Sequence, residues 1–205
     1  MTVWVVKLGG SLANSEELPR WLDVIATAGA GKVVLVPGGG PWADEVRAAQ
    51  KREGFDDRVA HRKALGAMEQ YGKVLAGMRA NLVPAAGITE IHEALRNGQI
   101  AVWMPYEMVV ADLSIPESWD VTSDSLAAWL AKQLGASALL LVKSLKIDRP
   151  QPGIEDLMRR GWVDPVFATF TSGTHFRILL LGQGDQKAAE RLLTTAGTAA
   201  ATSLG

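Results

Sequence analysis

The sequence predicts an α/β fold in which a mostly parallel sheet is covered by helices on both faces. Short, nearly continuous runs of Val, Leu and Ile alternate with segments whose apolar residues recur every three or four positions. Strands that are apolar throughout are typical of a sheet buried between two layers of helices, and strands alternating with helices are typical of parallel pairing. Two of the apolar runs also end in glycines that precede a helix, which favours a ligand site at the carboxyl ends of the strands.

The predicted strands are bounded by glycine, proline and polar residues. The run after residue 100 ends at Pro105, because the residue before a proline is restricted and a proline offers no N–H to a sheet. The expected strands cover residues 4–8, 32–36, 82–83, 100–104, 138–142 and 176–181.

The predicted helices follow from apolar periodicity and from capping signals. Residues 122–125, Thr-Ser-Asp-Ser, are typical of a helix start, and Gly135 is a typical helix stop. Residues 105–121 show no clear period and are expected to form a loop that borders a pocket. The expected helices cover residues 15–28, 41–51, 56–79, 89–96, 126–134, 153–160, 163–170 and 186–193.

The length of 205 residues is sufficient for one domain with a substantial core. We expect a single domain over residues 1–193 and a flexible C-terminal tail over 194–205, because the tail consists mainly of Ala, Thr and Gly. No signal for a domain boundary or an internal repeat is present in the sequence.

Composition excludes several classes of function. The chain has no cysteine, which rules out disulfides, thiol catalysis and cysteine-bound zinc. With 21 Lys and Arg against 22 Asp and Glu, its charge gives no reason to bind nucleic acid or an anionic membrane. No apolar run reaches membrane-spanning length, and we expect a cytoplasmic protein that acts on a small molecule.

The two glycine turns point to phosphate binding. Glycines let backbone N–H groups approach an anion with no Cβ in the way, and a lysine just before the first turn adds a full positive charge. Neither turn has the spacing of a P-loop or of a dinucleotide-binding motif, so those enzyme classes fit poorly. The residues concerned are Lys7, Gly9 and Gly10 in the first turn and Gly38, Gly39 and Gly40 in the second.

The order of these motifs resembles the amino acid kinase family. Residues 7–11 read Lys-Leu-Gly-Gly-Ser, a glycine triplet follows at 38–40, and Asp124 stands at the start of a helix that leads into the next strand. The resemblance covers residues 3–147. It implies a three-layer α/β/α sandwich that transfers the γ-phosphoryl group of ATP with Mg²⁺, and a homo-oligomer that contacts its partner through the helix near residues 68–78.

The resemblance also implies roles for individual residues. Lys7 would neutralise phosphate oxygens, Asp124 would orient the catalytic lysine or the metal region, and the glycines together with Ser11 would hold phosphates. The second lysine of many family members follows a Gly-Gly-Met run that is absent here, and Lys143 is the nearest substitute. Two alternatives from local structure stay open, namely that Asp124 and Ser11 are only helix caps.

Two segments contain candidate residues for binding the phosphate acceptor. Arg58, His61 and Arg62 gather cationic groups near the glycine triplet, where an acceptor phosphate would lie, although such a run also fits a solvated helix face. Trp103, Glu107 and Trp119 mix aromatic rings with an acid, as a flat ring carrying an amine requires, although the rings also fit a packed loop.

The short length and the run from Trp119 to Asp124 are similar to the subgroup that phosphorylates [5-(aminomethyl)furan-3-yl]methyl phosphate to its diphosphate in methanofuran-type cofactor biosynthesis. A uridylate-like or isopentenyl phosphate-like kinase is the nearest alternative. A protein that binds a nucleotide or oxyanion for storage or sensing is another. No metal-ligand set is visible, because His61, His92 and His175 are widely separated.

Overall fold

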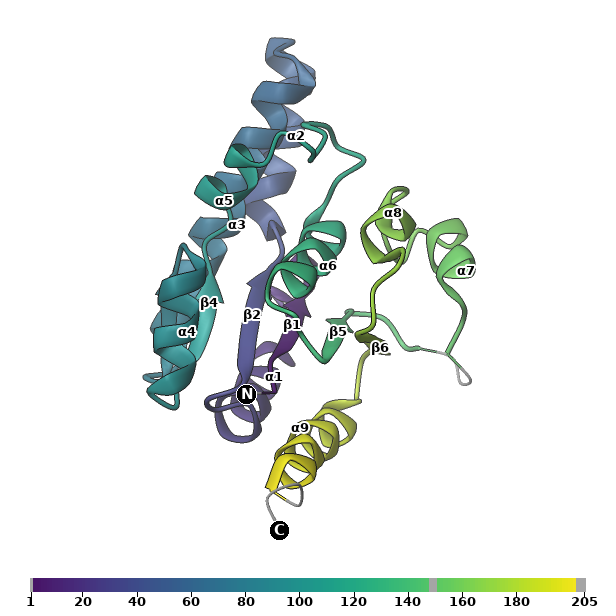
Figure 1. Ribbon diagram of the computed structural model, residues 1–205. Helices are drawn as coiled ribbons and strands as arrows, with labels where there is room; N and C mark the ends of the chain where they lie inside the picture. The colour runs from purple at the N-terminus through teal and green to yellow at the C-terminus, as the bar shows by residue number, and fades with distance from the viewer. Residues whose placement is uncertain (1, 148–150, 202–205) are drawn as a thin grey trace.

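A computed structural model describes residues 2–147 and 151–201 and contains one sheet of six parallel strands. The strand order is β3-β4-β2-β1-β5-β6 (Figure 1). The strands are β1 (Trp4–Leu8), β2 (Val33–Pro37), β3 (Leu82–Ala85), β4 (Ile100–Trp103), β5 (Ala138–Val142) and β6 (Arg177–Leu181). The predicted α/β class and the parallel sheet are confirmed.

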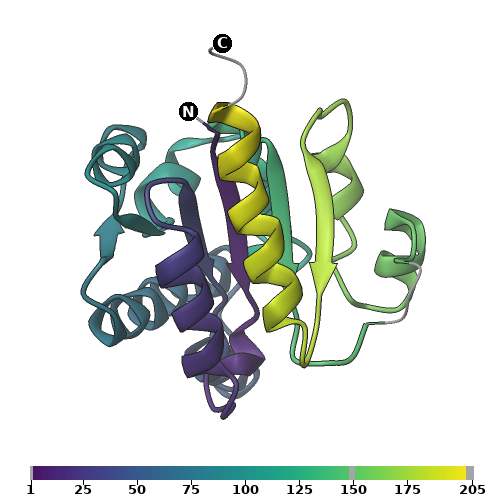
Figure 2. The ribbon, with the colours of Figure 1, turned by 90° about the horizontal axis from the view of Figure 1, so that it is seen from below.

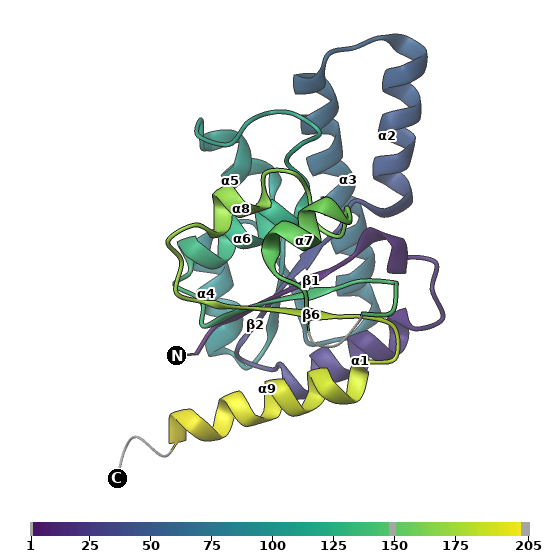
Figure 3. The same cartoon turned by 90° about the vertical axis from the view of Figure 1, so that its right-hand side faces the viewer.

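Helices connect the strands and cover both faces of the sheet (Figure 3). The elements are the 3-10 turn η1 (Gly10–Leu12), α1 (Leu18–Ala28), α2 (Gly40–Glu53), α3 (Asp57–Met78), α4 (Ile88–Arg96), α5 (Tyr106–Ala111), α6 (Ser123–Gln133), α7 (Ile154–Arg159), α8 (Phe167–Thr171) and α9 (Gln186–Ala201). The predicted three-layer α/β/α sandwich is therefore confirmed. The hairpin of α2 and α3 extends beyond the sheet.

The alternation of side chains along β1 divides the core into two parts. Trp4, Val6 and Leu8 pack with α1 and α9, which lie side by side on one face in Figure 2. Val5 faces the opposite side, where the buried residues of α6 lie. Every residue from Ser123 to Ala131 is buried, so α6 is enclosed on all sides except at its last two residues.

The order of the strands creates a switch point beside β1. The chain runs from β1 to β2 on one side, and β5 later pairs with β1 on the other side in register, Leu8 opposite Val142. Ligands in open parallel sheets bind at the carboxyl ends of the strands where the order reverses. The glycines after β1 and β2 and Lys143 after β5 all lie at this edge.

Two short helices differ clearly from the sequence prediction. The expected loop at 105–121 contains α5, whose first N–H, from Tyr106, donates to Glu69 Oε1 at 3.0 Å. The helix expected at 163–170 is α8, which begins at Phe167. Tertiary contacts rather than periodicity place such short helices, since six and five residues are too few to show a helical repeat.

The last helix is longer than predicted. We expected it to end at Leu193, but α9 continues to Ala201, so the first part of the expected tail is helical, and its flexibility stays a prediction. Alanine has the highest helix propensity, and the hydroxyls of Thr194 and Thr195 donate to the carbonyls of Glu190 and Arg191 at 2.8 Å each. Residues 202–205 lie outside the described residues. None of the helices described here has the length and apolar character needed to cross a membrane.

Candidate active site

Two lysines from neighbouring strands meet at one carboxylate. Lys7 Nζ lies 3.0 Å from Asp124 Oδ1, and Lys143 Nζ lies 2.8 Å from the same oxygen. The convergence follows from the alternation of side chains along a strand. The side chains of Val5 and Lys7 on β1 point to the face that α6 covers. Leu141 on β5 and Lys143, directly after that strand, point to the same face. Asp124 is in the first turn of α6, directly above both strand ends.

This trio is almost removed from water, which makes its charges interact strongly. The side chains of Lys7, Asp124 and Lys143 are 6%, 8% and 12% exposed. Burial alone would raise the pKa of Asp124, but the two lysines outweigh it and hold that pKa below its usual value. Burial, together with the charge of Lys7, lowers the pKa of Lys143 to about 8. The trio therefore carries one net positive charge when both lysines are protonated.

A second buried carboxylate, Asp164, holds the start of α6. Its Oδ2 accepts from the N–H and hydroxyl of Thr122 at 3.0 and 2.8 Å and from the N–H of Ser125 at 3.1 Å, while Oδ1 accepts from the Ser125 hydroxyl. Asp124 lies between these two anchored residues. Sequence reasoning missed Asp164, because nothing local links it to a helix about forty residues earlier.

The two glycine turns touch each other. A Cβ on Gly10 would lie 2.2 Å from the backbone nitrogen of Gly40, and a Cβ on Gly38 would lie 2.4 Å from the nitrogen of Gly10. Only glycine fits at these approaches. Gly39 and Gly40 begin α2, where the first N–H groups have no partner within the helix and attract anions.

Ser11 joins the first turn to the end of β5. Its hydroxyl lies 2.7 Å from the hydroxyl of Ser144, the residue after Lys143. The contact makes the loops after β1 and β5 one continuous rim. Whether Ser11 binds phosphate stays a prediction.

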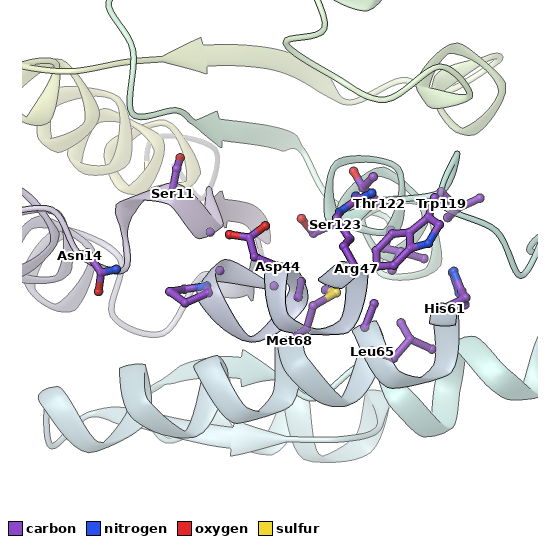
Figure 4. Close-up of a pocket in the computed structure, with 18 residues that line it drawn as sticks. Ser11, Asn14, Asp44, Arg47, His61, Leu65, Met68, Trp119, Thr122 and Ser123 are labelled. Atoms are coloured by element: carbon purple, nitrogen blue, oxygen red, sulfur yellow. The ribbon is translucent and has the colours of Figure 1, made fainter. Parts of the chain in front are cut away.

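A cavity of about 350 Å³ opens beside the glycine turns (Figure 4). That volume is at the small end of the range for ligand pockets. Its walls come from η1, α2, α3, the segment before α6 and the start of α6. The lining side chains labelled in Figure 4 are Ser11, Asn14, Asp44, Arg47, His61, Leu65, Met68, Trp119, Thr122 and Ser123.

Comparison with known proteins agrees with this geometry. The sequence model of the amino acid kinase family matches residues 2–146 of the chain. The chain belongs to this family. The resemblance inferred from the glycine turns and Asp124 is therefore confirmed.

One curated relative within the family is the [5-(aminomethyl)furan-3-yl]methyl phosphate kinase of Methanocaldococcus jannaschii. It is 27% identical over 138 residues, which are 67% of this chain and 63% of that relative. The match therefore spans slightly less than two thirds of the relative's length.

Solved structures of amino acid kinase fold proteins are similar along almost the whole chain. The uridylate kinase of Archaeoglobus fulgidus superposes with a TM-score of 0.68 at 17% identity and covers 96% of both chains. An isopentenyl phosphate kinase superposes with a TM-score of 0.60 at 14% identity and covers 94% of this chain and 96% of the other. At such identities the likeness shows the fold.

The acceptor residues predicted on α3 have different environments. Arg62 donates two hydrogen bonds of 2.9 Å to the carboxylate of Glu117, and Arg58 lies 3.3 Å from the same group. Both guanidinium groups are therefore engaged by a carboxylate rather than directed as a pair into the cavity. His61 does line the cavity, with Nδ1 3.0 Å from the carbonyl oxygen of Ser118.

The aromatic and acidic residues predicted to contact the acceptor also differ in their positions. Trp103 is fully buried and its ring stacks on Trp129 at 5.9 Å, so its predicted contact with an acceptor is wrong. It faces the sheet core because β4 is covered on both faces. Glu107 is exposed on α5 and does not line the cavity. Trp119 does line it, and the Arg47 guanidinium lies 3.7 Å from the centre of the Trp119 ring.

Arg47 and Asp44 are cavity residues that sequence reasoning missed. Both lie on α2, where Gly40, Asp44 and Arg47 follow at spacings of four and three residues and so share one face. This spacing, counted from the glycine triplet, is the sequence signal that could have identified the two cavity residues. Among the described residues no cluster of three or more His, Asp or Glu side chains is arranged to hold a metal ion.

Proposed function

We propose that this chain transfers the γ-phosphoryl group of ATP to a small phosphomonoester and so produces a diphosphate. The observation that carries the proposal is the convergence of Lys7 and Lys143 on Asp124 at the edge of the two glycine turns. Two cations held side by side at a switch point provide the positive charge that a transferring phosphoryl group requires. The pair of lysines supports transfer over simple storage of a nucleotide.

In the proposed reaction an oxygen of the acceptor phosphate bonds to the γ-phosphorus of ATP, and the bond from that phosphorus to the β–γ bridging oxygen breaks. ADP leaves with the bonding electrons. The acceptor oxygen is already anionic, so no general base is needed. Asp124 orients the two lysines, because both of its oxygens accept from Lys143 at 2.8 Å and one also contacts Lys7.

The glycine turns fit phosphate groups. The two turns pack directly against each other, with no room for a Cβ on Gly10 or Gly38, and Gly39 and Gly40 at the start of α2 offer N–H groups that have no partner within the helix. We propose that ATP brings Mg²⁺ on its phosphates, as is usual at kinase sites. When bound, Mg²⁺ would neutralise part of the phosphate charge.

For the acceptor we propose [5-(aminomethyl)furan-3-yl]methyl phosphate, in the synthesis of a methanofuran-type cofactor. Two observations support it: the relative from Methanocaldococcus jannaschii is named for this substrate, and the cavity combines apolar Leu65 and Met68 with polar groups. Arg47, stacked on Trp119, is the cavity cation that suits the acceptor phosphate.

An assay of ADP release tests both the proposed phosphotransfer and the proposed acceptor. Purified protein with Mg-ATP receives the aminomethylfuran phosphate, uridine monophosphate or isopentenyl phosphate, each at matched concentrations, and one sample receives no acceptor. We expect the highest kcat/KM with the furan compound. A preference for either other acceptor would keep the phosphotransfer and overturn the furan assignment. ADP release that no acceptor accelerates would overturn the phosphotransfer itself.

A further inference from the structure

Gln50 on α2 fixes the ring of Trp119 in the cavity wall. The indole N–H of Trp119 donates to Gln50 Oε1 at 2.6 Å. Gln50 Nε2 donates in turn to the carbonyl oxygen of Phe55 at 3.2 Å and to Asp57 Oδ1 at 2.8 Å. A carbonyl and an ionised carboxylate can only accept, so the amide has one orientation, in which its oxygen faces the indole.

The ring of Trp119 supports the guanidinium group of Arg47. The guanidinium carbon lies 3.7 Å from the centre of the ring, which is within the range of a cation–π contact. No hydrogen bond or ion pair with another described residue holds this guanidinium in place. An arginine side chain has many rotamers, so a support that restricts it lowers the entropic cost of binding an anion.

Trp119 connects two parts of the site that belong to different elements. Arg47 is on α2, which has no buried residue and packs mainly against α3 beyond the sheet (Figure 3). Trp119 is in the segment that leads directly into α6 and to Asp124, the carboxylate that contacts both lysines. The contacts of Trp119 therefore set the position of Arg47 relative to the two lysines.

We infer that Gln50 is a positioning residue, which acts through Trp119 to hold the Arg47 guanidinium where the acceptor phosphate binds. The inference rests on the proposed function, because that proposal assigns Arg47 to the acceptor phosphate. Gln50 itself does not line the cavity. Its loss should therefore weaken acceptor binding through the position of Arg47 and leave ATP binding at the glycine turns unchanged.

Two substitutions remove the same hydrogen bond from opposite sides. Gln50→Met keeps a long unbranched side chain with good helix propensity but has no amide. Trp119→Phe keeps an aromatic ring beside Arg47 but has no N–H. Asp57→Ala is the matched control, because it removes one bond between Gln50 and α3 and leaves the bonds of Gln50 to Phe55 and Trp119.

The bond itself is detected by NMR of ¹⁵N-labelled protein without any ligand. The indole N–H signal of Trp119 is identified by its absence in Trp119→Phe. We expect this signal to move upfield in Gln50→Met, because its proton loses an acceptor, and to stay in place in Asp57→Ala.

Calorimetry then measures the dissociation constants of the aminomethylfuran phosphate, uridine monophosphate and isopentenyl phosphate, in the presence of Mg²⁺ and a non-hydrolysable ATP analogue. For the compound that the wild type binds most tightly, Gln50→Met and Trp119→Phe should raise Kd about threefold to tenfold, the range for one hydrogen bond. The double variant should bind no more weakly than the weaker single variant, because both changes remove one bond. Asp57→Ala should keep Kd within about twofold of wild type, and so should every variant for the ATP analogue.

The outcomes separate this inference from the proposed function. An unmoved indole signal or an unchanged acceptor Kd in Gln50→Met would overturn the inference. Losses that add in the double variant, an equal loss in Asp57→Ala or for the ATP analogue, or no binding of any of the three compounds would also overturn it. The expected changes in binding without any turnover would keep the inference and overturn the proposed phosphotransfer.

Discussion

Lys143 connects the geometry of the site to its pH dependence. Its pKa is lowered to about 8 by burial and by Lys7, so the free enzyme loses this cation as the pH rises through 8. Because kcat/KM reports the free enzyme, we expect it to fall about tenfold per pH unit above that value.

The variant Lys143→Arg tests this assignment, because a guanidinium stays charged throughout the assay range. We expect a lower maximal kcat/KM, since the planar group does not reproduce the position of the ammonium, and no decline between pH 8 and 10. An unchanged decline in the arginine variant would show that another group titrates.

Asp164 is predicted to act through Asp124. In Asp164→Asn, one carboxylate oxygen becomes an NH₂ group that cannot accept from Thr122 or Ser125. We expect α6 to lose its anchor, with a loss of stability of about 1–3 kcal/mol and a fall in kcat larger than the change in KM for ATP. Urea denaturation and steady-state kinetics measure both quantities. The conservative Asp164→Glu should restore part of kcat, and a loss of stability with normal kcat would show a purely structural role.

At the scale of single residues, the sequence indicated residues that belong to local motifs and missed residues whose partners come from distant segments. Lys7, Asp124 and Lys143 were singled out because they lie near strand ends or open a helix, and the structure brings them together. Asp164 and Arg47 were missed because their partners come from distant segments, and Trp103 was misplaced because an aromatic at a strand end looks the same whether it faces a pocket or the core.

The contact between the two glycine turns makes a prediction at the scale of an element. Gly10→Ala would bring a Cβ against the backbone of Gly40, which only a shift of η1 or α2 can relieve. We expect loss of measurable ATP binding and a lower melting temperature.

Gly66→Ala is the matched control, because nothing lies within 4 Å of its Cβ position in the interior of α3. Alanine in a helix interior is favoured over glycine by about 1 kcal/mol, so this variant should be as stable as the wild type or more stable. Equal ATP affinity in the two alanine variants, measured by calorimetry, would contradict the predicted role of the contact.

Elements with a long repeat or a clear cap were predictable. α3 and α6 were expected because their apolar spacing and their caps, Asp56 and Thr122, are local signals. α5 was not, because tertiary contacts rather than a repeat decide so short a helix, and the end of α9 was not, because the alanine-rich segment after Leu193 has helix propensity but no apolar repeat.

Across the whole molecule, the core between the sheet and helices α1 and α9 lies on one face, and the candidate catalytic side chains lie on the opposite face. Leu193 on α9 is fully buried on the face of α1, opposite the trio under α6. Leu193→Ala should cost about 2–5 kcal/mol of unfolding free energy through the cavity it leaves. We expect kcat/KM of the folded variant to stay within about twofold at 25 °C. A large loss of kcat/KM in protein that is still folded would contradict this separation.

The parallel sheet and a ligand site at the carboxyl ends of its strands were predictable at this scale, because apolar strands, helices and glycine turns recur in a fixed order along the chain. The strand order that creates the switch point beside β1 was not, because no local pattern specifies which strands pair. The single domain over residues 1–193, the homo-oligomer and the cytoplasmic location stay predictions. Oligomerisation depends on a second surface, which one chain's sequence pattern does not identify.

The most direct test of the proposed phosphotransfer is a phosphorus NMR time course with Mg-ATP and the aminomethylfuran phosphate. The account predicts that new diphosphate signals and ADP appear in equal amounts, and that Lys7→Ala, folded by circular dichroism, forms neither. Inorganic phosphate as the sole product, no reaction of the wild type, or full activity of Lys7→Ala would contradict it.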